Sequence, residues 1–253
     1  MSGSLHTARP PGDTPGTAHA AAFDGKGAPA AEVRAMFARI APTYDLLNSM
    51  LSAKRDRAWR RATAESIDPQ ARRVLDLCAG TGDLALEIAA RRPQAFVCAA
   101  DFCFEMLVRG KPKGLAQAAA PAACDGLCLP FADGTFDAVT AAFGVRNFED
   151  LPAGLREMRR VTRRGGQIAV LEFFRNESPW RDAPFRFYFR EVLPRIGHLV
   201  SRDGEAYSYL PRSVGRFATR REFTTLLASA GWGDVQQCDL TLGIATLVTA
   251  HAV

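Results

Sequence analysis

The chain has 253 residues, 47% of them hydrophobic and 23% charged, which is enough for one sizeable core and favours a single α/β domain. No apolar stretch reaches the roughly eighteen residues that a membrane-spanning helix needs. The net charge of +5 fits a solvated basic face or a contact with anionic lipid head groups. Nucleic-acid binding is a weaker explanation of this charge, because basic residues form no long run and do not alternate with aromatic ones.

The N-terminal 28 residues are rich in alanine, glycine and proline and carry almost no large apolar side chain. Such a segment cannot bury enough surface to become ordered, so we expect a disordered tail over residues 1–28 and one folded domain over 29–253. The tail lacks the apolar core of a secretion signal and the six cysteines are scattered, so a reducing, cytoplasmic location is expected. Cys124 and Cys128 have no second pair nearby, so no metal site is predicted.

The folded part begins with a predicted helix, because apolar residues recur there at three- and four-residue spacing: Val33, Met36, Phe37 and Ile40. A second amphipathic stretch runs from Leu46 toward Trp59, and together these segments predict a cap of two or three helices. Strands and helices then alternate. The predicted strands are Arg73–Cys78, Phe96–Ala100, Ala118–Cys124, Phe136–Ala142 and Gln167–Glu172. The predicted helices are Leu84–Ala90, one that begins at Phe104–Val108, and Leu151–Val161. This alternation predicts a parallel sheet with helices on both faces.

The C-terminal part follows a different pattern. Thr219–Ala230 is predicted as a helix, and two strands follow it, Val235–Leu240 and Ile244–Ala250. Only three residues separate these strands, so they must form an antiparallel hairpin. Between the fifth strand and the helix lies an insertion, Arg175–Phe217, whose many aromatic residues suggest a lid or substrate segment. Before the fifth strand, Gly165-Gly166 is predicted as a turn that leads into it.

The stretch VLDLCAGTGD, residues 74–83, is a buried strand followed by a glycine turn and an acid. Gly80 and Gly82 allow the backbone to approach a ligand closely, and the following helix directs free N–H groups toward it. Asp83 directly follows the second glycine, where a carboxylate would repel a pyrophosphate but suit an ammonium or sulfonium group. Asp76, inside the strand, adds a second negative charge below the turn.

Asp101 ends the next strand, where an acid can accept hydrogen bonds from both hydroxyls of a ribose. An adenosine with a cationic, phosphate-free tail meets all these conditions, which predicts S-adenosylmethionine as cofactor. The alternatives are an ordinary α/β loop whose acids are caps, an NAD-dependent oxidoreductase, which Asp83 and the altered glycine spacing oppose, and a nucleotide-binding scaffold without turnover.

Several motifs resemble the class I S-adenosylmethionine-dependent methyltransferases: VLDLCAGTGD, AADFCFEML, LPFADGTFDAVTAAFGVRNFED and LREMRRVTRRGGQIAVLEF. Others resemble one branch, the C-methyltransferases of menaquinone and ubiquinone biosynthesis: MFARIAPTYDLLNSMLS, AFGVRNF, LPRIGHLVSRDGEAYSYLPRSV and TLGIATL. The resemblance covers about residues 33 to 250. It implies a Rossmann-like, seven-stranded, mostly parallel sheet with an antiparallel last strand, an N-terminal helical cap and an insertion after strand 5. It also implies a lipid-tailed hydroquinone as methyl acceptor, with either demethylmenaquinol or the ubiquinone precursor possible and the former favoured.

The resemblance also implies the cofactor contacts. Family contacts fall on Thr81 and Asp101, and on Asp125-Gly126 beside the adenine. The complete predicted cofactor set is Asp76, Gly80, Thr81, Gly82, Asp101, Phe102, Asp125, Gly126 and Ala142. Four positions depart from the family pattern. They are Ala142 in place of a serine, Lys54 in place of a glycine, Arg164 in place of a proline, and Val248 in place of a histidine.

For catalysis, the resemblance implies that Arg146 and Asn147 hold and stabilise the acceptor phenolate. The alternative for Arg146 is a structural ion pair with Glu149 or Asp150. Asp203 and Tyr207 match the branch and are predicted to orient the substrate or relay a proton through water.

Three further predictions concern the surroundings of the site. His198 is read as a surface histidine, and Tyr44 and Asp45 are expected to close over the cofactor. The aromatic and basic stretch around residues 185–190 suits an acceptor channel, core packing of the insertion, or peripheral contact at the inner face of the plasma membrane. A prenylated quinol is the expected partner, nucleic acid is not, and a homodimer is left open.

Overall fold

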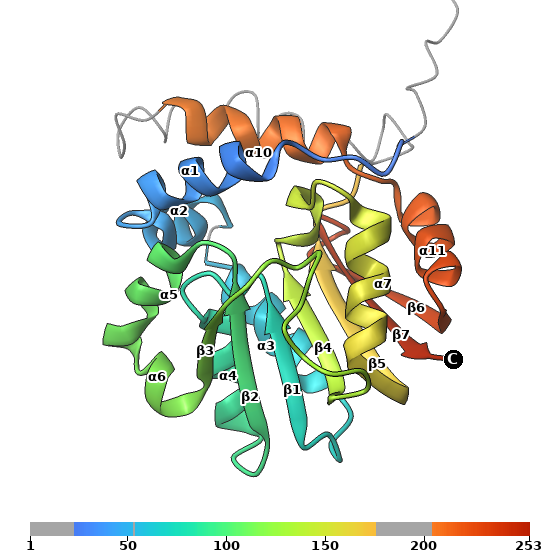
Figure 1. Cartoon of the computed structure of the whole chain (residues 1–253). Coiled ribbons are helices and arrows are strands. Elements are labelled where there is room, and N and C mark those ends of the chain that lie inside the picture. The colour runs from blue at the N-terminus through green and yellow to red at the C-terminus, as the bar shows by residue number, and fades with distance from the viewer. Residues whose placement is uncertain (1–22, 53, 176–203) are drawn as a thin grey trace, which may run out of the picture.

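The computed structural model describes residues 23–52, 54–175 and 204–253 (Figure 1). Its centre is a seven-stranded sheet in the order β3-β2-β1-β4-β5-β7-β6. The strands are β1 (Arg73–Leu77), β2 (Phe96–Asp101), β3 (Ala120–Ala123), β4 (Phe136–Ala142), β5 (Thr162–Glu172), β6 (Trp232–Leu240) and β7 (Ala245–Ala252). The pairs from β3 to β5 are parallel, whereas β7 runs antiparallel to both β5 and β6. The predicted fold, with its C-terminal hairpin, is confirmed.

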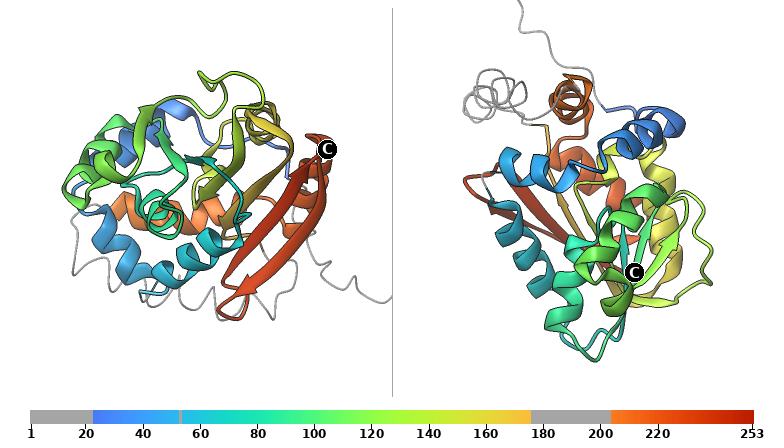
Figure 2. Two further views of the ribbon diagram at one scale, coloured as in Figure 1. Left: turned by 90° about the horizontal axis from the view of Figure 1, so that it is seen from below. Right: turned by 90° about the vertical axis from the view of Figure 1, so that its left-hand side faces the viewer.

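Helices cover both faces of this sheet (Figure 2). They are α1 (Ala30–Ile40), α2 (Tyr44–Leu51), α3 (Asp56–Ser66), α4 (Asp83–Arg91), α5 (Phe104–Gly110), α6 (Leu115–Ala118), α7 (Leu151–Val161), α10 (Gly204–Arg216) and α11 (Arg220–Ser229), with short 3₁₀ turns η1 (Lys111–Lys113) and η2 (Val145–Asn147). Because successive strand residues point to opposite faces, Leu75 packs with α7 and α11, whereas Val74 packs with α3 and α4.

The start of β5 differs from the prediction. Gly165-Gly166 was expected to turn into the strand, but the strand already begins at Thr162 and the glycines form an irregularity within it, where its register against β4 shifts. Gly165 has a φ of +70°, and a Cβ at Gly166 would lie 2.7 Å from the carbonyl oxygen of Asp137. The glycines therefore permit a bulge where β5 approaches β4, rather than a separate turn.

The cap lies over the carboxyl ends of the parallel strands, where α1 and α2 meet the loops of the sheet (Figure 1). Val33, Met36 and Ile40 form the buried face of α1, as their spacing predicts. Beyond α2, Lys54 has a φ of +63°, a left-handed conformation that glycine adopts at lower cost. This conformation suits the glycine that the family resemblance implies at this position.

The N-terminal segment is in contact with the domain before residue 29. The Phe23 ring packs edge-on against Phe217, and the Gly27 N–H donates to the Glu149 carbonyl at 3.1 Å. Lys26 pairs with Asp150 at 2.5 Å. Ordered contacts thus begin six residues ahead of the predicted domain start at residue 29, and the remainder of the predicted tail, residues 1–22, lies outside the described part.

Most of the predicted insertion also lies outside the described part of the chain, including His198, Asp203 and the aromatic stretch at 185–190. Its last section forms α10, which contains Tyr207 and packs near η2 over the same end of the sheet as α1 (Figure 1). In the described ranges, no helix combines the length and apolar character required to cross a bilayer.

Candidate active site

The glycine turn, residues 78–82, joins β1 to α4 at the carboxyl edge of the sheet. Gly80 and Gly82 have φ values of +57° and +85°, and a Cβ at Gly82 would lie 2.4 Å from Leu115. Asp101, at the end of the neighbouring β2, accepts a hydrogen bond from the Gly80 N–H at 2.8 Å through Oδ2. Its Oδ1 accepts from the Cys103 N–H at 2.8 Å. The acid that follows β2 thus fixes the position of the turn that follows β1.

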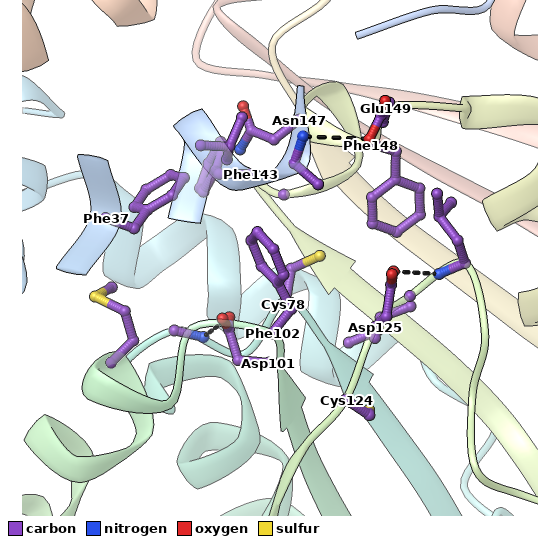
Figure 3. A pocket seen from close by; sticks show the side chains of 18 of the residues that line it. Phe37, Cys78, Asp101, Phe102, Cys124, Asp125, Phe143, Asn147, Phe148 and Glu149 are labelled. Atoms are coloured by element: carbon purple, nitrogen blue, oxygen red, sulfur yellow. Dashed lines mark hydrogen bonds between the residues drawn. The ribbon is translucent and has the colours of Figure 1, made fainter. Parts of the chain in front are cut away.

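A larger cavity opens beside this turn, with about 700 Å³ of space free of protein atoms when the part open to solvent is counted. Figure 3 shows Asp101 and Asp125 along one side of it and Asn147 opposite. Phe37 and Tyr44 of the cap also line it. Apolar atoms form most of its wall, so the cavity suits a ligand with an apolar or aromatic part.

The structure brings the predicted cofactor residues together in two places. Four of them line the larger cavity with Gly80: Asp101, Phe102, Asp125 and Gly126. Three line a smaller neighbouring cavity: Asp76, Thr81 and Ala142. Gly82 completes the glycine turn between them. At Gly126 a Cβ would lie 2.9 Å from the Phe148 ring, so a side chain at this position would crowd the wall of the larger cavity.

Asp76 is a buried carboxyl with one unpartnered oxygen. It is 1% exposed, and its Oδ1 accepts a hydrogen bond from the Thr140 hydroxyl at 2.8 Å. Its Oδ2 has no partner in the structure. Burial raises the pKa of Asp76 to about 7, and the bond from Thr140 acts in the opposite direction. A buried oxygen of this kind is costly unless a donor from a ligand reaches it.

This environment predicts a pH dependence of stability. The raised pKa of about 7 lets the folded chain keep the Asp76 proton across a range in which the unfolded chain, with a pKa of about 3.9, releases it. Stability supplied by Asp76 is therefore complete at low pH and is lost as pH rises toward 7, with a slope of at most about 1.4 kcal/mol per unit. Urea unfolding at several pH values should show this loss in the wild type and a flatter profile in Asp76→Asn. Equal slopes in both proteins would contradict it.

Arg146 and Asn147 lie together in η2, at the end of β4. The Arg146 guanidinium donates through Nη1 to both carboxylate oxygens of Glu172, at 2.9 and 3.1 Å, and to the Phe143 carbonyl at 2.5 Å. Glu172 is fully buried at the end of β5. Burial raises the pKa of the Glu172 carboxyl, whereas Arg146 beside it lowers that pKa. Asn147 lines the larger cavity, and its Oδ1 accepts a hydrogen bond from the Tyr209 hydroxyl of α10 at 2.9 Å.

The structural partner of Arg146 is therefore Glu172, and the alternative that paired Arg146 with Glu149 or Asp150 is wrong. Asp150 instead caps α7 through the Ala153 N–H and pairs with Lys26, while Glu149 accepts from the Ala30 N–H. Glu172 was predicted only as the end of a strand. No sequence pattern marked its pairing with Arg146, because that contact depends on β5 lying beside β4 in the sheet.

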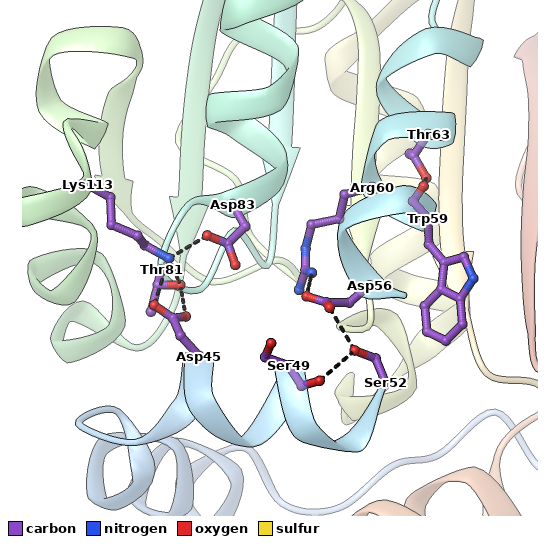
Figure 4. A network of polar contacts seen from close by, with 10 residues as sticks. All are labelled: Asp45, Ser49, Ser52, Asp56, Trp59, Arg60, Thr63, Thr81, Asp83 and Lys113. Carbon is purple, nitrogen blue, oxygen red and sulfur yellow. Dashed lines mark hydrogen bonds and ion pairs between the residues drawn. The ribbon is translucent and has the colours of Figure 1, made fainter. Parts of the chain in front are cut away.

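Tyr44 and Asp45 of α2 meet the glycine turn, and their closure over the cofactor stays a prediction. Asp45 accepts a hydrogen bond from the Thr81 hydroxyl at 2.6 Å (Figure 4). Sequence reasoning missed Lys113, whose ammonium donates to Asp45, Thr81 and Asp83. The charge of Asp83 is thereby balanced, so Asp83 opposes a phosphate less strongly than its position in the sequence suggests.

Across the described ranges, no three His, Cys, Asp or Glu side chains gather in a way that could hold a metal ion. Tyr207 lies in α10, and Asp203 lies outside the described residues. Their predicted roles toward the substrate therefore stay predictions.

Comparison with known proteins adds relatives that match most of the chain. A demethylmenaquinone methyltransferase from Deinococcus radiodurans is 46% identical over 216 residues, which are 84% of this chain and 89% of that protein. A ubiquinone/menaquinone biosynthesis C-methyltransferase UbiE from Geotalea daltonii is 43% identical over 229 residues, 87% of this chain and 96% of that protein. The crystal structure of an S-adenosylmethionine-dependent methyltransferase from Thermotoga maritima is similar in fold, with a TM-score of 0.61, 16% identity, and coverage of 87% of this chain and 99% of that one.

A family model, that of the ubiE/COQ5 methyltransferase family, also matches most of the chain. It matches residues 26–252, which include the cap, the glycine turn, Asp101, η2 and the C-terminal hairpin. The match begins within the N-terminal segment that contacts α7, and it ends in the last residue of β7. With this match and relatives more than 40% identical over most of their length, the chain belongs to the ubiE/COQ5 methyltransferase family.

Proposed function

We propose that this chain transfers the methyl group of S-adenosylmethionine to a ring carbon of a prenylated hydroquinone, converting demethylmenaquinol to menaquinol in menaquinone biosynthesis. Family membership and the demethylmenaquinone methyltransferase from Deinococcus radiodurans support this reaction. The alternative acceptor is the ubiquinone precursor 2-methoxy-6-polyprenyl-1,4-benzoquinol, because the name of the UbiE relative covers both ubiquinone and menaquinone biosynthesis. The structural observation that carries the proposal is the larger cavity, a mostly apolar space with Asp101 bonded to the glycine turn at its side.

The residues present fit S-adenosylmethionine. Asp101 uses one lone pair of each oxygen on the backbone, so both oxygens can still accept from ribose hydroxyls. Asp125 and Gly126 form the far side of the same cavity, where an adenine would lie. The unpartnered oxygen of Asp76 adds an acceptor for an ammonium group. When bound, the cofactor supplies an electrophilic methyl group on a positively charged sulfur, which this acidic surrounding favours.

The acceptor must be oriented and its oxygen deprotonated, because a phenolate pushes electron density onto the neighbouring ring carbon. Asn147 lines the larger cavity and directs its carbonyl oxygen to Tyr209, which leaves its amide NH₂ to donate to the acceptor oxygen. The nearby Arg146 holds a positive charge that Glu172 fixes in place. Such preorganised donors stabilise developing charge, and orientation supplies much of the remaining rate. Asp203 and Tyr207 are the groups proposed to orient the substrate or relay its proton.

The prenyl tail of the acceptor places this chemistry close to a lipid phase. We therefore include peripheral contact of a cytoplasmic protein with the inner face of the plasma membrane, supported by the net charge of +5 and by the aromatic and basic stretch at residues 185–190. Co-sedimentation with anionic liposomes, with Phe185, Phe187 and Tyr188 intact or replaced by serine, tests this contact. Binding that is equal in both proteins would argue against that stretch as the contact.

The reaction itself is tested with purified protein, S-adenosylmethionine and either of the two quinols. The proposal expects formation of S-adenosylhomocysteine together with a methylated quinol, identified by mass spectrometry, and faster turnover of demethylmenaquinol. A chain that binds the cofactor but forms no S-adenosylhomocysteine with either quinol would be a scaffold. Faster turnover of the benzoquinol would replace the first acceptor by the alternative.

A further inference from the structure

The tip of the C-terminal hairpin, residues 241–244, extends past the edge of the sheet at which the candidate site lies. Thr246 of β7 pairs with Glu172, the last residue of β5, so the residues before Thr246 continue beyond the carboxyl end of that strand. Figure 2 shows the turn between β6 and β7 at the margin of the molecule, beside α3, in both views. The hairpin tip is therefore an outward-facing element on the side of the molecule that holds the larger cavity.

The base of the hairpin tip is fixed against α3. The Trp59 indole N–H donates to the Thr241 hydroxyl at 2.8 Å. Leu240 and Ala245, which pair with each other across the hairpin, pack in one apolar cluster with Trp59. Ala245 is completely buried in this cluster. The direction in which the tip extends is therefore set by the core and by α3.

The end of the hairpin tip presents apolar side chains to the solvent. Leu242 is fully exposed and Ile244 is 38% exposed. Thr241 and Leu242 have φ values of +49° and +58°, the left-handed region that residues with a side chain adopt at a cost. Hairpin turns of this conformation favour asparagine and glycine instead. An exposed leucine in a strained turn is unfavourable in water, and a contact that buries it would offset that cost.

Positive charge lies beside the apolar tip. Three exposed cations stand at the start of α3: Lys54, Arg55 and Arg57. The Arg55 carbonyl accepts from the Trp59 N–H at 3.0 Å, so Arg55 lies one helical turn from the residue that binds the tip. The acid in the same turn, Asp56, is already neutralised by Arg60. This side of the molecule therefore combines apolar side chains with an excess of cations, which suits an anionic surface with an apolar interior.

We propose that the hairpin tip docks on an anionic lipid bilayer, with Leu242 and Ile244 inserted at the boundary of head groups and acyl chains and the three cations of α3 against the head groups. The choice of a bilayer over a protein surface rests on the proposed function, because a prenylated acceptor reaches the candidate site from lipid. Docking through the tip would turn the edge of the sheet that carries the larger cavity toward the membrane. This surface is distinct from the stretch at residues 185–190.

Flotation of the full chain with vesicles measures this contact, with phosphatidylcholine alone or mixed with phosphatidylglycerol. The wild type should bind the anionic vesicles, and added salt should weaken the binding. Leu242→Ser combined with Ile244→Ser should lower the partition coefficient by about 10- to 100-fold, the loss expected when two apolar side chains no longer enter the bilayer. Leu242→Trp should bind at least as tightly as the wild type, because tryptophan favours the bilayer interface.

The contribution of charge is measured separately. Lys54→Gln combined with Arg55→Gln should lower binding to the anionic vesicles by about 10-fold and leave binding to the neutral vesicles unchanged. Phe96 is the matched control for the apolar residues, because it is 54% exposed and begins β2 at the opposite edge of the sheet. Phe96→Ser should bind the vesicles as the wild type does.

Three results would overturn the inference. One is a wild type that does not bind the anionic vesicles. Another is unchanged vesicle binding in the double serine variant at Leu242 and Ile244. The third is conversion of a dimer to a monomer by that variant, seen by light scattering with vesicle binding unchanged, which would make a second copy of the chain the occupant of the tip.

Two quinols distinguish failure of this inference from failure of the proposed function. The wild type and the double serine variant should methylate a short-tailed, water-soluble demethylmenaquinol at equal rates. The variant should methylate a long-tailed quinol in anionic vesicles about 10-fold more slowly than the wild type or worse. Equal loss with both quinols would make the tip a structural element and overturn the inference. A wild type that binds the vesicles but methylates neither quinol would overturn the proposed function alone.

Discussion

Replacing Asp101 by alanine will weaken the binding of S-adenosylmethionine by about 100-fold or more, since hydrogen bonds to a charged group contribute about 1.5–3 kcal/mol each and more than one is lost. The substitution removes the acceptor offered to the ribose hydroxyls. It also releases the Gly80 N–H, which Asp101 holds at 2.8 Å, and so frees the glycine turn from β2. The lost acceptor and the freed turn both weaken the binding of S-adenosylmethionine.

Calorimetric titration with S-adenosylhomocysteine measures this effect without turnover. Asp133→Ala is the matched control, because its side chain is 81% exposed and lies far along the chain from the glycine turn. The control should bind as the wild type does. If Asp101→Ala also bound with wild-type affinity, the adenosine would have to lie elsewhere.

A second large effect concerns stability: Glu172→Ala will lower the free energy of unfolding by about 3–5 kcal/mol, the usual cost of leaving one member of a buried ion pair without its partner. Arg146 is 8% exposed in its side chain and Glu172 is 0% exposed, so water cannot replace the lost carboxylate. The same substitution releases the Arg146 guanidinium, which neighbours Asn147 in the wall of the larger cavity, so activity should fall as well.

Urea unfolding of Glu172→Ala checks the magnitude, and Glu65→Ala serves as its control, because Glu65 is 54% exposed and forms exposed pairs with Arg61 and Arg91. That control should lose less than about 1 kcal/mol. The double variant Glu172→Leu with Arg146→Met should recover much of the stability while losing activity, since apolar residues can replace a buried pair. A single variant as stable as the wild type would show that the pair contributes nothing.

The bounds of helices and strands could be predicted closely where apolar residues recur at regular spacing in the sequence. The bounds of β4 and α7 agree with their predicted ranges, and the short connection before Ala245 identified the antiparallel hairpin. Asp101 and the glycine turn were also placed correctly, because parallel strands finish at one edge of a sheet and bring their following residues together.

Side-chain partners across elements could not be predicted in the same way. Glu172 meets Arg146 only because β4 and β5 are neighbours in one register, and a single strand pattern carries no such information. Lys113 stands in a short 3₁₀ turn without periodicity, and it reaches Asp45 across the cap. Arg60 lines the smaller cavity because α3 packs beside α4, and no sequence pattern marks that contact.

The most direct test of the whole account is mass spectrometry of the quinone pool in a strain that lacks this chain. We expect demethylmenaquinone to accumulate and menaquinone to disappear, and we expect the wild-type gene, but not Asp101→Ala, to restore the methylated quinone. A pool that is unchanged by the deletion would contradict the proposed reaction.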